Sequence, residues 1–425
     1  MGGWQGDPEV NFFLGRHQDG GSQSADDALA PGRNGGHPVA TRTFSWQAFG
    51  AGIFAAFVGF ASSFAVIVQG LTAVGATSAQ AASGLMALSL GMGICGILLS
   101  ARTRMPISIA WSTPGAALLA TSGRVEGGFA AAVGAFLVAA ALVVVAGLWK
   151  PLGRAVAAIP LPLASAMLAG VLFGLCLAPV KAVAQAPALG LPVVVAWALV
   201  ARLNRLYAVP AALLVTIVLV VVTAQGTAVE GSLWPLPVLV TPSFSLAALI
   251  GIALPLFVVT MASQNIPGIA VLNVNGYRPA PGPLFTVTGL FSLLAAPFGG
   301  HAINLAAITA ALCAGPDAHP DPKRRYWAAI TTGGAYLLFG LLAGAAIAFV
   351  GASPPILIEA VAGLALLGAF GSALVAALAE PGDREAAVVT FIVTASGIGF
   401  FGISGAFWGL IAGGLIHALA RWPRR

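Results

Sequence analysis

The chain has 425 residues, of which 59% are hydrophobic and only 8% are charged, and its mean hydropathy is +0.96. A soluble domain carries roughly 25% charged residues, so this composition excludes a soluble protein. The net charge of +6 comes from basic residues that lie singly or in small groups between apolar segments, which argues against a nucleic-acid-binding surface.

Apolar stretches recur along nearly the whole chain. Residues 1–45 are rich in polar residues and glycine and predict a disordered cytoplasmic tail. From Trp46 onward the stretches are about 20 residues long, enough to cross a bilayer. The sequence therefore predicts an all-α polytopic membrane protein with fourteen transmembrane segments. These are expected at residues 47–70, 78–100, 106–122, 127–148, 156–178, 187–201, 207–224, 246–272, 283–299, 300–315, 326–350, 355–379, 385–401 and 403–420.

The basic residues separate between alternate connections of this arrangement. One set of connections holds only Arg124 and Lys181. The opposite set holds Arg42, Arg102, Arg104, Lys150, Arg154, Arg202, Arg205, Arg278, Lys323, Arg324, Arg325, Arg384, Arg421, Arg424 and Arg425. Positively charged loops stay on the cytoplasmic side, so both termini are expected there.

Fourteen segments divide into two sevens, and an odd number in each half inverts the second half. Weak self-similarity supports such a repeat. FVGFASSFAVIV from Phe57 pairs with FVVTMASQNIPGIAV from Phe257, and PISIAWSTPGAALLA from Pro106 pairs with GHAINLAAITAALCA from Gly300. Inverted repeats of this kind are typical of secondary transporters.

The third segment is expected to be broken in the membrane. Ser112 and Thr113 precede Pro114, which is the pattern of a helix start, with Thr113 as the expected cap. The residues before them, MPISIAWST, suit an extended stretch, so this segment is predicted as an extended stretch followed by a half-helix. Backbone of this kind survives at membrane depth only where it is buried in protein or lines a cavity.

The tenth segment carries the matching break. Pro297, Gly299 and Gly300 interrupt the helix, and Asn304 is expected to cap a half-helix that follows it. Inversion would point the two half-helix starts towards each other, and each start offers partial positive charge and free N–H donors. The two breaks together predict an anion site.

Polar and aromatic residues near the breaks complete the candidate site. Buried amides are costly in a membrane unless they are satisfied, which singles out the Ser-Gln-Asn run in the eighth segment. The candidate substrate-binding residues are Phe60, Ser62, Ser63, Trp111, Ser112, Thr113, Gly115, Ser263, Gln264, Asn265 and Asn304. The serines could equally be packing contacts between helices, and Phe57 and Phe60 could be core or lipid-facing side chains.

His301 lies at membrane depth and is the candidate proton-coupling residue, because histidine titrates near neutral pH. The alternative is a neutral histidine that satisfies the broken backbone. Cys95, Cys176 and Cys313 lack CxxC spacing, so no metal site is expected. A GxGxxG pattern ends at Gly402 without a surrounding βαβ unit, and no cofactor or enzymatic activity is predicted.

Several strings resemble the BenE family of benzoate–proton symporters: AWSTPGAALL, PLFVVTMASQNIPGIA, AAITAALCAGPDAHPD, EAAVVTFIVTASG and AFWGLIAGG. The resemblance runs from about Ser45 to the C-terminus. It implies the 7+7 inverted-repeat fold of the uracil and sulfate permeases, often a homodimer, with a site between the first, third, eighth and tenth segments. The implied parts are a core domain at 46–148 and 246–350 and a gate domain at 149–225 and 351–425, after the tail at 1–45.

The resemblance implies a transporter of the bacterial inner membrane that imports benzoate or a related aromatic carboxylate with protons. The nucleobase relatives bind substrate through acidic side chains on the eighth and tenth segments, and this chain has amides and a histidine there. The missing acids fit an anionic substrate. A nucleobase–proton symporter and an inorganic-anion transporter or channel on the same fold remain alternatives.

Overall fold

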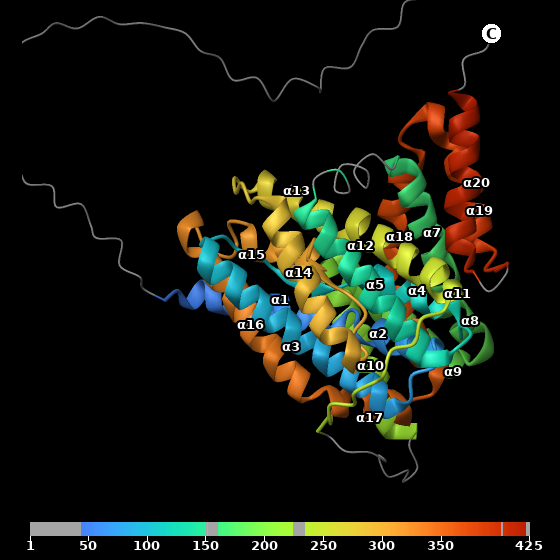
Figure 1. Ribbon diagram of the computed structural model, residues 1–425. Coiled ribbons are helices and arrows are strands. Elements are labelled where there is room, and N and C mark those ends of the chain that lie inside the picture. The colour runs from blue at the N-terminus through green and yellow to red at the C-terminus, as the bar shows by residue number, and fades with distance from the viewer. Residues whose placement is uncertain (1–43, 150, 152–159, 224–233, 401–402, 422–425) are drawn as a thin grey trace, which may run out of the picture. The chain divides into compact units, whose positions relative to one another are not determined.

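The computed structural model describes residues 44–149, 151, 160–223, 234–400 and 403–421, and this part of the chain is largely helical (Figure 1). The expected tail lies outside the described residues, apart from Phe44 and Ser45. The first half contains α1 (Trp46–Ala61), α2 (Phe64–Ala73), α3 (Ser78–Thr103), β1 (Ile109–Trp111), α4 (Thr113–Ser122), α5 (Gly128–Leu148), α7 (Leu161–Cys176), α8 (Ala178–Gln185), α9 (Pro187–Leu203) and α10 (Arg205–Thr223). The second half contains α11 (Leu246–Ala248), η1 (Leu249–Ala253), α12 (Leu254–Thr260), η2 (Met261–Asn265), α13 (Ile266–Val274), α14 (Pro281–Ala295), η3 (Ala296–Phe298), β2 (Ile303–Leu305), α15 (Ile308–Ala314), η4 (Pro322–Arg324), α16 (Tyr326–Leu341), α17 (Ala343–Ala352), α18 (Pro355–Leu378), η5 (Pro381–Asp383), α19 (Arg384–Ala395) and α20 (Gly405–Ala420).

Membrane-spanning helices make up most of the described chain. Eight stretches are long and apolar enough to cross a bilayer, and a ninth is the pair Pro322–Leu341 and Ala343–Ala352, bent by 57°. The other five expected segments are shorter: α9, α19 and α20 have 17, 12 and 16 residues, and the third and tenth each combine a strand with a half-helix. Both halves begin with an irregular helical span, a long helix, a strand with a half-helix, and another long helix. The predicted all-α polytopic fold is confirmed.

The two broken segments meet in the interior. β1 and β2 pair antiparallel, with Ala110 opposite Asn304. The ladder extends by one hydrogen bond at each side, from Ser112 N to Ala302 O and from Ala306 N to Ser108 O, both 3.0 Å. This pairing satisfies backbone groups that lipid could not, which is why an extended stretch is tolerated here.

The start of the second half-helix differs from the prediction. Asn304 was expected to cap it, but Asn304 lies within β2, and α15 begins only at Ile308 after Ala307. The Asn304 side chain instead donates to Leu305 O at 2.8 Å. The capping prediction is wrong because pairing with the antiparallel partner strand keeps the backbone extended over Ile303–Leu305, beyond the glycine break.

Two further irregularities were not predicted. The first span divides between Ala61 and Phe64, where the Ser62 and Ser63 hydroxyls donate to Gly59 O at 3.3 and 2.8 Å. Hydroxyls that bond back to a carbonyl three or four residues earlier bend or weaken a helix. The eighth span widens into π-helical turns at η1 and η2, and such turns are frequent at functional sites.

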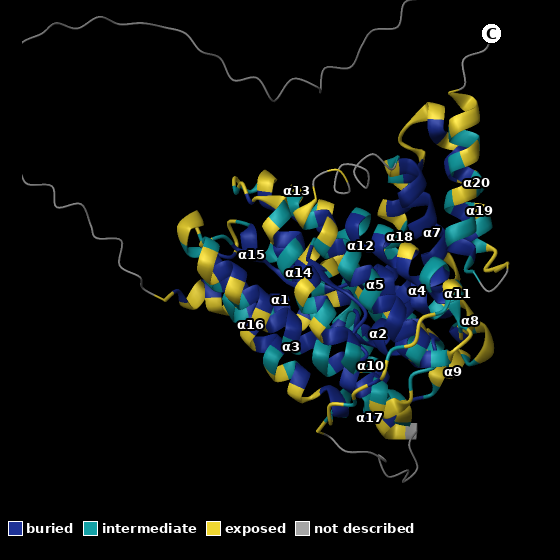
Figure 2. Cartoon of the chain, viewed as in Figure 1, coloured by how far each residue is buried: buried dark blue, intermediate teal, exposed yellow. Residues whose placement is uncertain are grey.

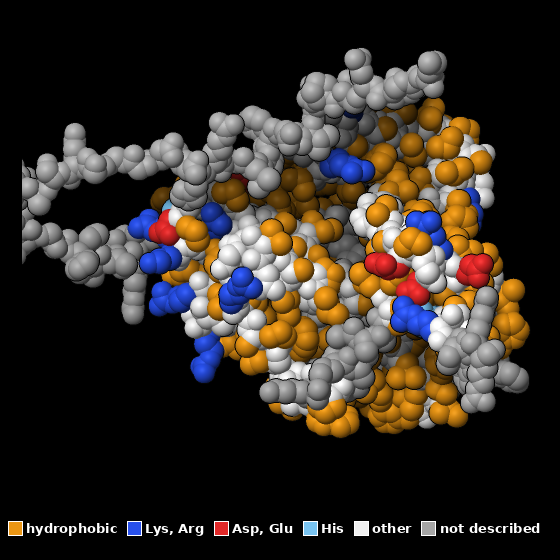
Figure 3. Space-filling model, turned by 90° about the horizontal axis from the view of Figure 1, so that it is seen from above, with side chains coloured by type: hydrophobic (Ala, Val, Ile, Leu, Met, Phe, Trp, Pro, Cys, Tyr) orange, Lys and Arg blue, Asp and Glu red, His pale blue; other side chains and the backbone are white. Residues whose placement is uncertain are grey.

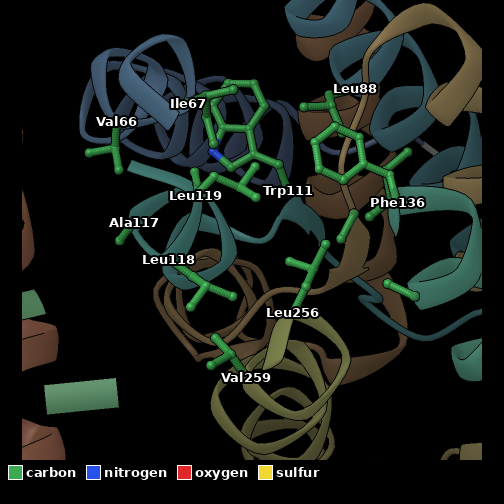
Figure 4. Packing of buried hydrophobic residues seen from close by; sticks show 14 of the residues in the cluster. Val66, Ile67, Leu88, Trp111, Ala117, Leu118, Leu119, Phe136, Leu256 and Val259 are labelled. Carbon is green, nitrogen blue, oxygen red and sulfur yellow. The ribbon is translucent and has the colours of Figure 1, made fainter. Parts of the chain in front are cut away.

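Helix packing is close where glycines face each other. α3 packs along α16, and a Cβ on Gly93 would lie 2.6 Å from Gly333 O. α14 packs between α3 and α5, whereas α7 packs on α18 and α19, and α9 packs on α10. Buried residues concentrate where these helices meet (Figure 2). The side chains of α4 insert between α2 and α12. Figure 4 shows this for Leu118 and Leu119 of α4 and for Leu256 of α12.

Charged side chains lie near the ends of the spans. Lys and Arg side chains are spread over the face seen in Figure 3, with hydrophobic side chains between them. At one end of α20, Asp383 Oδ1 lies 2.9 Å from His417 Nδ1 and 3.5 Å from an Arg421 guanidinium nitrogen. The buried interior is largely hydrophobic, with serine and threonine hydroxyls scattered through it and two amides and a histidine gathered near the two breaks.

Candidate functional site

A cavity of about 100 Å³ lies where the two broken segments meet. A cavity needs a volume of about 10–15 Å³, measured in the same way, to hold one water molecule. This cavity therefore has room for a small solute. Its wall is built from the α1–α2 break, the β1–α4 and β2–α15 junctions, η2, α3 and α16, and from α18 on the remaining side.

Five of the predicted site residues lie on this wall, from three separate parts of the chain. They are Ser62, Ser63, Trp111, Thr113 and Gln264. The first half-helix begins at the cavity, since Thr113 is its first residue. Helix starts carry N–H groups without intrahelical partners and a partial positive charge, which favour an anion. No Asp or Glu is among the described residues that line the cavity.

Trp111 is held in place by the break in the first span. Its Nε1 donates to Ser63 Oγ at 2.8 Å, and Ser63 Oγ in turn donates to Gly59 O at 2.8 Å. The single Ser63 proton is therefore committed to the backbone, and Ser63 acts chiefly as the anchor of the indole. An aromatic face in a fixed orientation on the cavity wall suits a flat apolar ligand.

Phe60 lies behind this indole and is absent from the cavity lining. Its ring lies 5.3 Å from the Trp111 ring, 5.7 Å from Phe64 and 4.9 Å from Phe339. These contacts form an aromatic cluster that supports Trp111. The structure places Phe60 one layer away from the cavity.

Ser112 ties the start of α4 to the eighth span. Its buried Oγ accepts from Gly115 N at 3.1 Å and from Thr260 Oγ1 at 2.9 Å. The cap of the half-helix is therefore Ser112, one residue before the expected Thr113. A Cβ on Gly115 would lie 2.5 Å from Leu256 Cδ1, so Gly115 allows α4 and α12 to approach. Ser112 and Gly115 therefore shape the site without lining the cavity.

The three consecutive polar residues of η2 make different contacts. Gln264 faces the cavity, whereas Ser263 Oγ donates to Val259 O at 2.5 Å. Asn265 is fully buried, and its Oδ1 accepts from Leu305 N at 3.0 Å. Asn265 thereby fastens strand β2 to the eighth span. The π-helical turn lets three consecutive polar residues serve a cavity, a helix and a strand.

His301 and Asn304 are fully buried beside the strand pair and are not part of the cavity lining. His301 Nε2 lies 2.8 Å from Ser112 O, and because a carbonyl oxygen only accepts, Nε2 is the donor. His301 Nδ1 and Asn304 Oδ1 have no hydrogen-bond partner among the described residues. This hydrogen bond places His301 against the backbone just before α4.

The cavity-lining residues on α15, α16 and α18 were not predicted from the sequence. Thr309 and Tyr336 bring hydroxyls to the cavity, and Leu366 brings an apolar side chain from α18. Thr309 Oγ1 lies 2.8 Å from Ser108 Oγ. A tyrosine within an otherwise apolar span is a signal that could have marked Tyr336. Nothing local distinguishes Leu366 from its neighbours.

No group of three or more potential metal ligands comes together among the described residues. The three cysteines are buried and unpaired. Nothing in the described donor set suggests a resident metal.

Comparison with known proteins agrees with this arrangement. The profile of the benzoate membrane transport protein family, BenE, matches residues 42–419. The chain belongs to the BenE family. The inner membrane protein YdcO of Escherichia coli (strain K12) is 43% identical over 373 residues, which cover 87% of this chain and 94% of that protein. The benzoate membrane transport protein of Acinetobacter baylyi (strain ATCC 33305 / BD413 / ADP1) is 32% identical over 385 residues, 88% of this chain and 95% of that protein.

Solved structures support the 7+7 fold of this BenE family member. The transmembrane domain of a cyanobacterial bicarbonate transporter, BicA, aligns with a TM-score of 0.54 at 14% identity, over 89% of this chain and 98% of that one. SLC26A9 aligns with a TM-score of 0.55 at 12% identity, over 87% of this chain and 65% of that one. At such low identity these likenesses concern the fold alone. The protein is a membrane transporter by family.

Proposed function

We propose that this protein imports benzoate or a related small aromatic carboxylate together with protons, by alternating access. The observation that carries the proposal is the cavity where the two broken transmembrane segments meet. It combines an anchored indole, hydroxyls, an amide and a half-helix start, and no acidic side chain lines it among the described residues. A relative 32% identical to this chain is named a benzoate membrane transport protein, which supports the substrate class.

The two ends of an aromatic acid match two kinds of wall. The ring would lie against Trp111 and Leu366, and the carboxylate would accept hydrogen bonds from the polar groups of the wall. A carboxylate in the wall would repel such a substrate, since like charges in a low-dielectric site interact strongly. The absence of Asp and Glu from the described cavity lining therefore favours a carboxylic acid substrate over a neutral nucleobase.

The helix contacts support a division into a core and a gate. Residues 46–148 and 246–350 would form the core domain, in which α3, α5, α14 and α16 pack on one another. Residues 149–225 and 351–425 would form the gate domain, where α7 packs on α18 and α19. The cavity lies between core elements and α18, so a movement of one domain against the other would expose it to alternate sides.

Proton coupling would run through the substrate's own carboxyl group or through His301. The Nδ1 atom of His301 is buried without a partner in the described chain, and its Nε2 is bonded to the backbone at the start of α4. A proton gained there would change the charge beside the site. The protein would lie in the bacterial inner membrane, with the basic connections and both termini on the cytoplasmic side.

Uptake of radiolabelled benzoate into proteoliposomes tests the proposal. An inward proton gradient should drive accumulation above the external concentration, and an uncoupler should abolish it. Protein-free vesicles are needed alongside, because protonated benzoate crosses lipid unaided. Equal uptake with and without protein, under a proton gradient, would refute benzoate transport.

Competition and variants separate the parts of the proposal. Excess unlabelled benzoate should compete with the label, whereas uracil and xanthine should not. Gln264→Ala should weaken binding with coupling retained, and His301→Ala should show whether accumulation depends on that ring. Dissipation of a benzoate gradient without any proton dependence would favour a channel.

A further inference from the structure

Tyr336 and Thr309 form a hydroxyl corner of the cavity that the sequence did not indicate. Tyr336 lies on α16 and is 2% exposed, and Thr309 lies on α15 and is 4% exposed. Both line the cavity. Neither helix supplied a residue to the site expected from sequence, so this corner is additional to the polar groups of the two breaks.

Gly59 shows that the two hydroxyl residues converge on the first span. A Cβ at Gly59 would overlap the Tyr336 hydroxyl oxygen and lie 2.9 Å from Thr309 Cγ2. The absence of a side chain at this position is therefore what lets the tyrosine hydroxyl reach the α1–α2 break. The same glycine also accepts the hydrogen bond of Ser63, through its carbonyl.

Neighbouring side chains hold the two residues of the corner in place. Ser108 Oγ holds Thr309 Oγ1 at 2.8 Å, and both residues are buried. The Tyr336 ring packs edge-on against Phe339, with 6.5 Å between centroids. A site for a small solute benefits from groups that are already held in place before the ligand arrives.

The hydroxyl of Tyr336 has capacity for a ligand. A phenol both donates and accepts a hydrogen bond, so the hydroxyl can offer its proton to a ligand in the cavity that Tyr336 lines. A hydroxyl at the edge of a cavity without acidic residues is a suitable donor to an anion. Hydrogen bonds to a charged acceptor are about twice as strong as neutral ones.

We propose that Tyr336 is a specificity-determining residue that donates a hydrogen bond to the carboxylate of the transported acid. This inference rests on the proposed function. Thr309 lies beside the phenol on the adjoining wall, and Gly59 keeps the space open. The carboxylate would then lie at the α1–α15–α16 corner, with the aromatic ring directed towards Trp111.

The test compares Tyr336→Phe with Tyr326→Phe in the benzoate uptake assay. Tyr326 is a buried tyrosine at the start of the same helix, outside the cavity lining, and serves as the matched control. Loss of one hydrogen bond to a charged group should raise the KM of Tyr336→Phe by about 10- to 100-fold. Its maximal rate should stay within about twofold, because binding and turnover separate in this way when a ground-state contact is lost.

A structural role would give a different pattern. It would lower the melting temperature of Tyr336→Phe below that of Tyr326→Phe and would reduce the maximal rate, with no selective effect on KM. Gly59→Ala provides a second test, since its methyl group would occupy the position of the hydroxyl and should also raise KM. If wild-type protein accumulates benzoate but Tyr336→Phe retains its KM, this inference is wrong while the proposed function stands. If wild-type protein does not transport benzoate, the proposed function fails first.

Discussion

Asn265 offers a direct test of how the broken segment is held. Its side chain was predicted to bind substrate, but in the structure its Oδ1 accepts the hydrogen bond of Leu305 N at 3.0 Å, from a fully buried position. Asn265→Ala would leave that backbone N–H without a partner in the interior. An unsatisfied buried donor costs about 1–3 kcal/mol, and the lost contact of Asn265 Nδ2 with Met261 Sδ adds little to it.

The consequence should appear in both stability and transport. The melting temperature of the detergent-purified protein should fall by several degrees, since about 1 kcal/mol shifts the midpoint by roughly 2–4 °C even in a domain of moderate size. Substrate affinity should fall as well, because β2 sets the position of α15 at the cavity.

Asn275→Ala is the matched control. Asn275 lies just after the same span, is only partly buried, and donates to Val271 O at 2.9 Å, a carbonyl next to the helix end. Its truncation leaves no buried donor and should change the melting temperature by less than about 1 °C. If Asn265→Ala has the same melting temperature as Asn275→Ala but a raised KM, then Asn265 is a substrate ligand. The inference that Asn265 fastens β2 to the eighth span would then be refuted.

Two further predictions follow from the packing around the breaks. Ser112→Ala should remove the cap from Gly115 N and lower the free energy of unfolding by about 1 kcal/mol, measured by thermal melting; an unchanged melting temperature would show that the cap is dispensable. Gly93→Val should separate α3 from α16, because a Cβ there already lies 2.6 Å from a backbone oxygen of α16, and the cost of about 1–3 kcal/mol for overpacking should reduce the yield of folded monodisperse protein, whereas Gly50→Val, with open space at its Cβ, should not.

Sequence patterns were sufficient for the breaks that contain proline or glycine. Pro114 cannot donate a backbone hydrogen bond, so the start of the first half-helix could be predicted to within one residue. Gly299 adopts φ of +91°, which explains why the chain can leave a helix there. The α1–α2 break has neither residue at its centre, only two serines, and serines are also common inside straight membrane helices. In the structure the Ser63 hydroxyl at this break meets the indole of Trp111, 48 residues away, and neighbouring residues do not reveal such a contact.

The site divides in a similar way. Ser62, Trp111 and Gln264 could be selected because polar or aromatic side chains near helix breaks are conspicuous in an apolar sequence. Asn304 was misassigned because the extent of a strand depends on its partner, and that partner comes from the other half of the chain. Tyr336 was missed because a helix shows from sequence alone which residues it contains, but not which of its faces meets a cavity.

The sequence by itself determined the class of protein, the fourteen segments and the places where two of them break. Hydrophobic length and the backbone limits of proline and glycine are local properties, so they can be read from neighbouring residues. Only the tertiary structure decided that both breaks pair as strands, that Asn265 fastens one of them, and that Tyr336 and Thr309 reach the cavity across Gly59. These arrangements depend on hydrogen bonds and close contacts between distant parts of the chain, and a buried polar group finds its partner only when the whole fold is assembled.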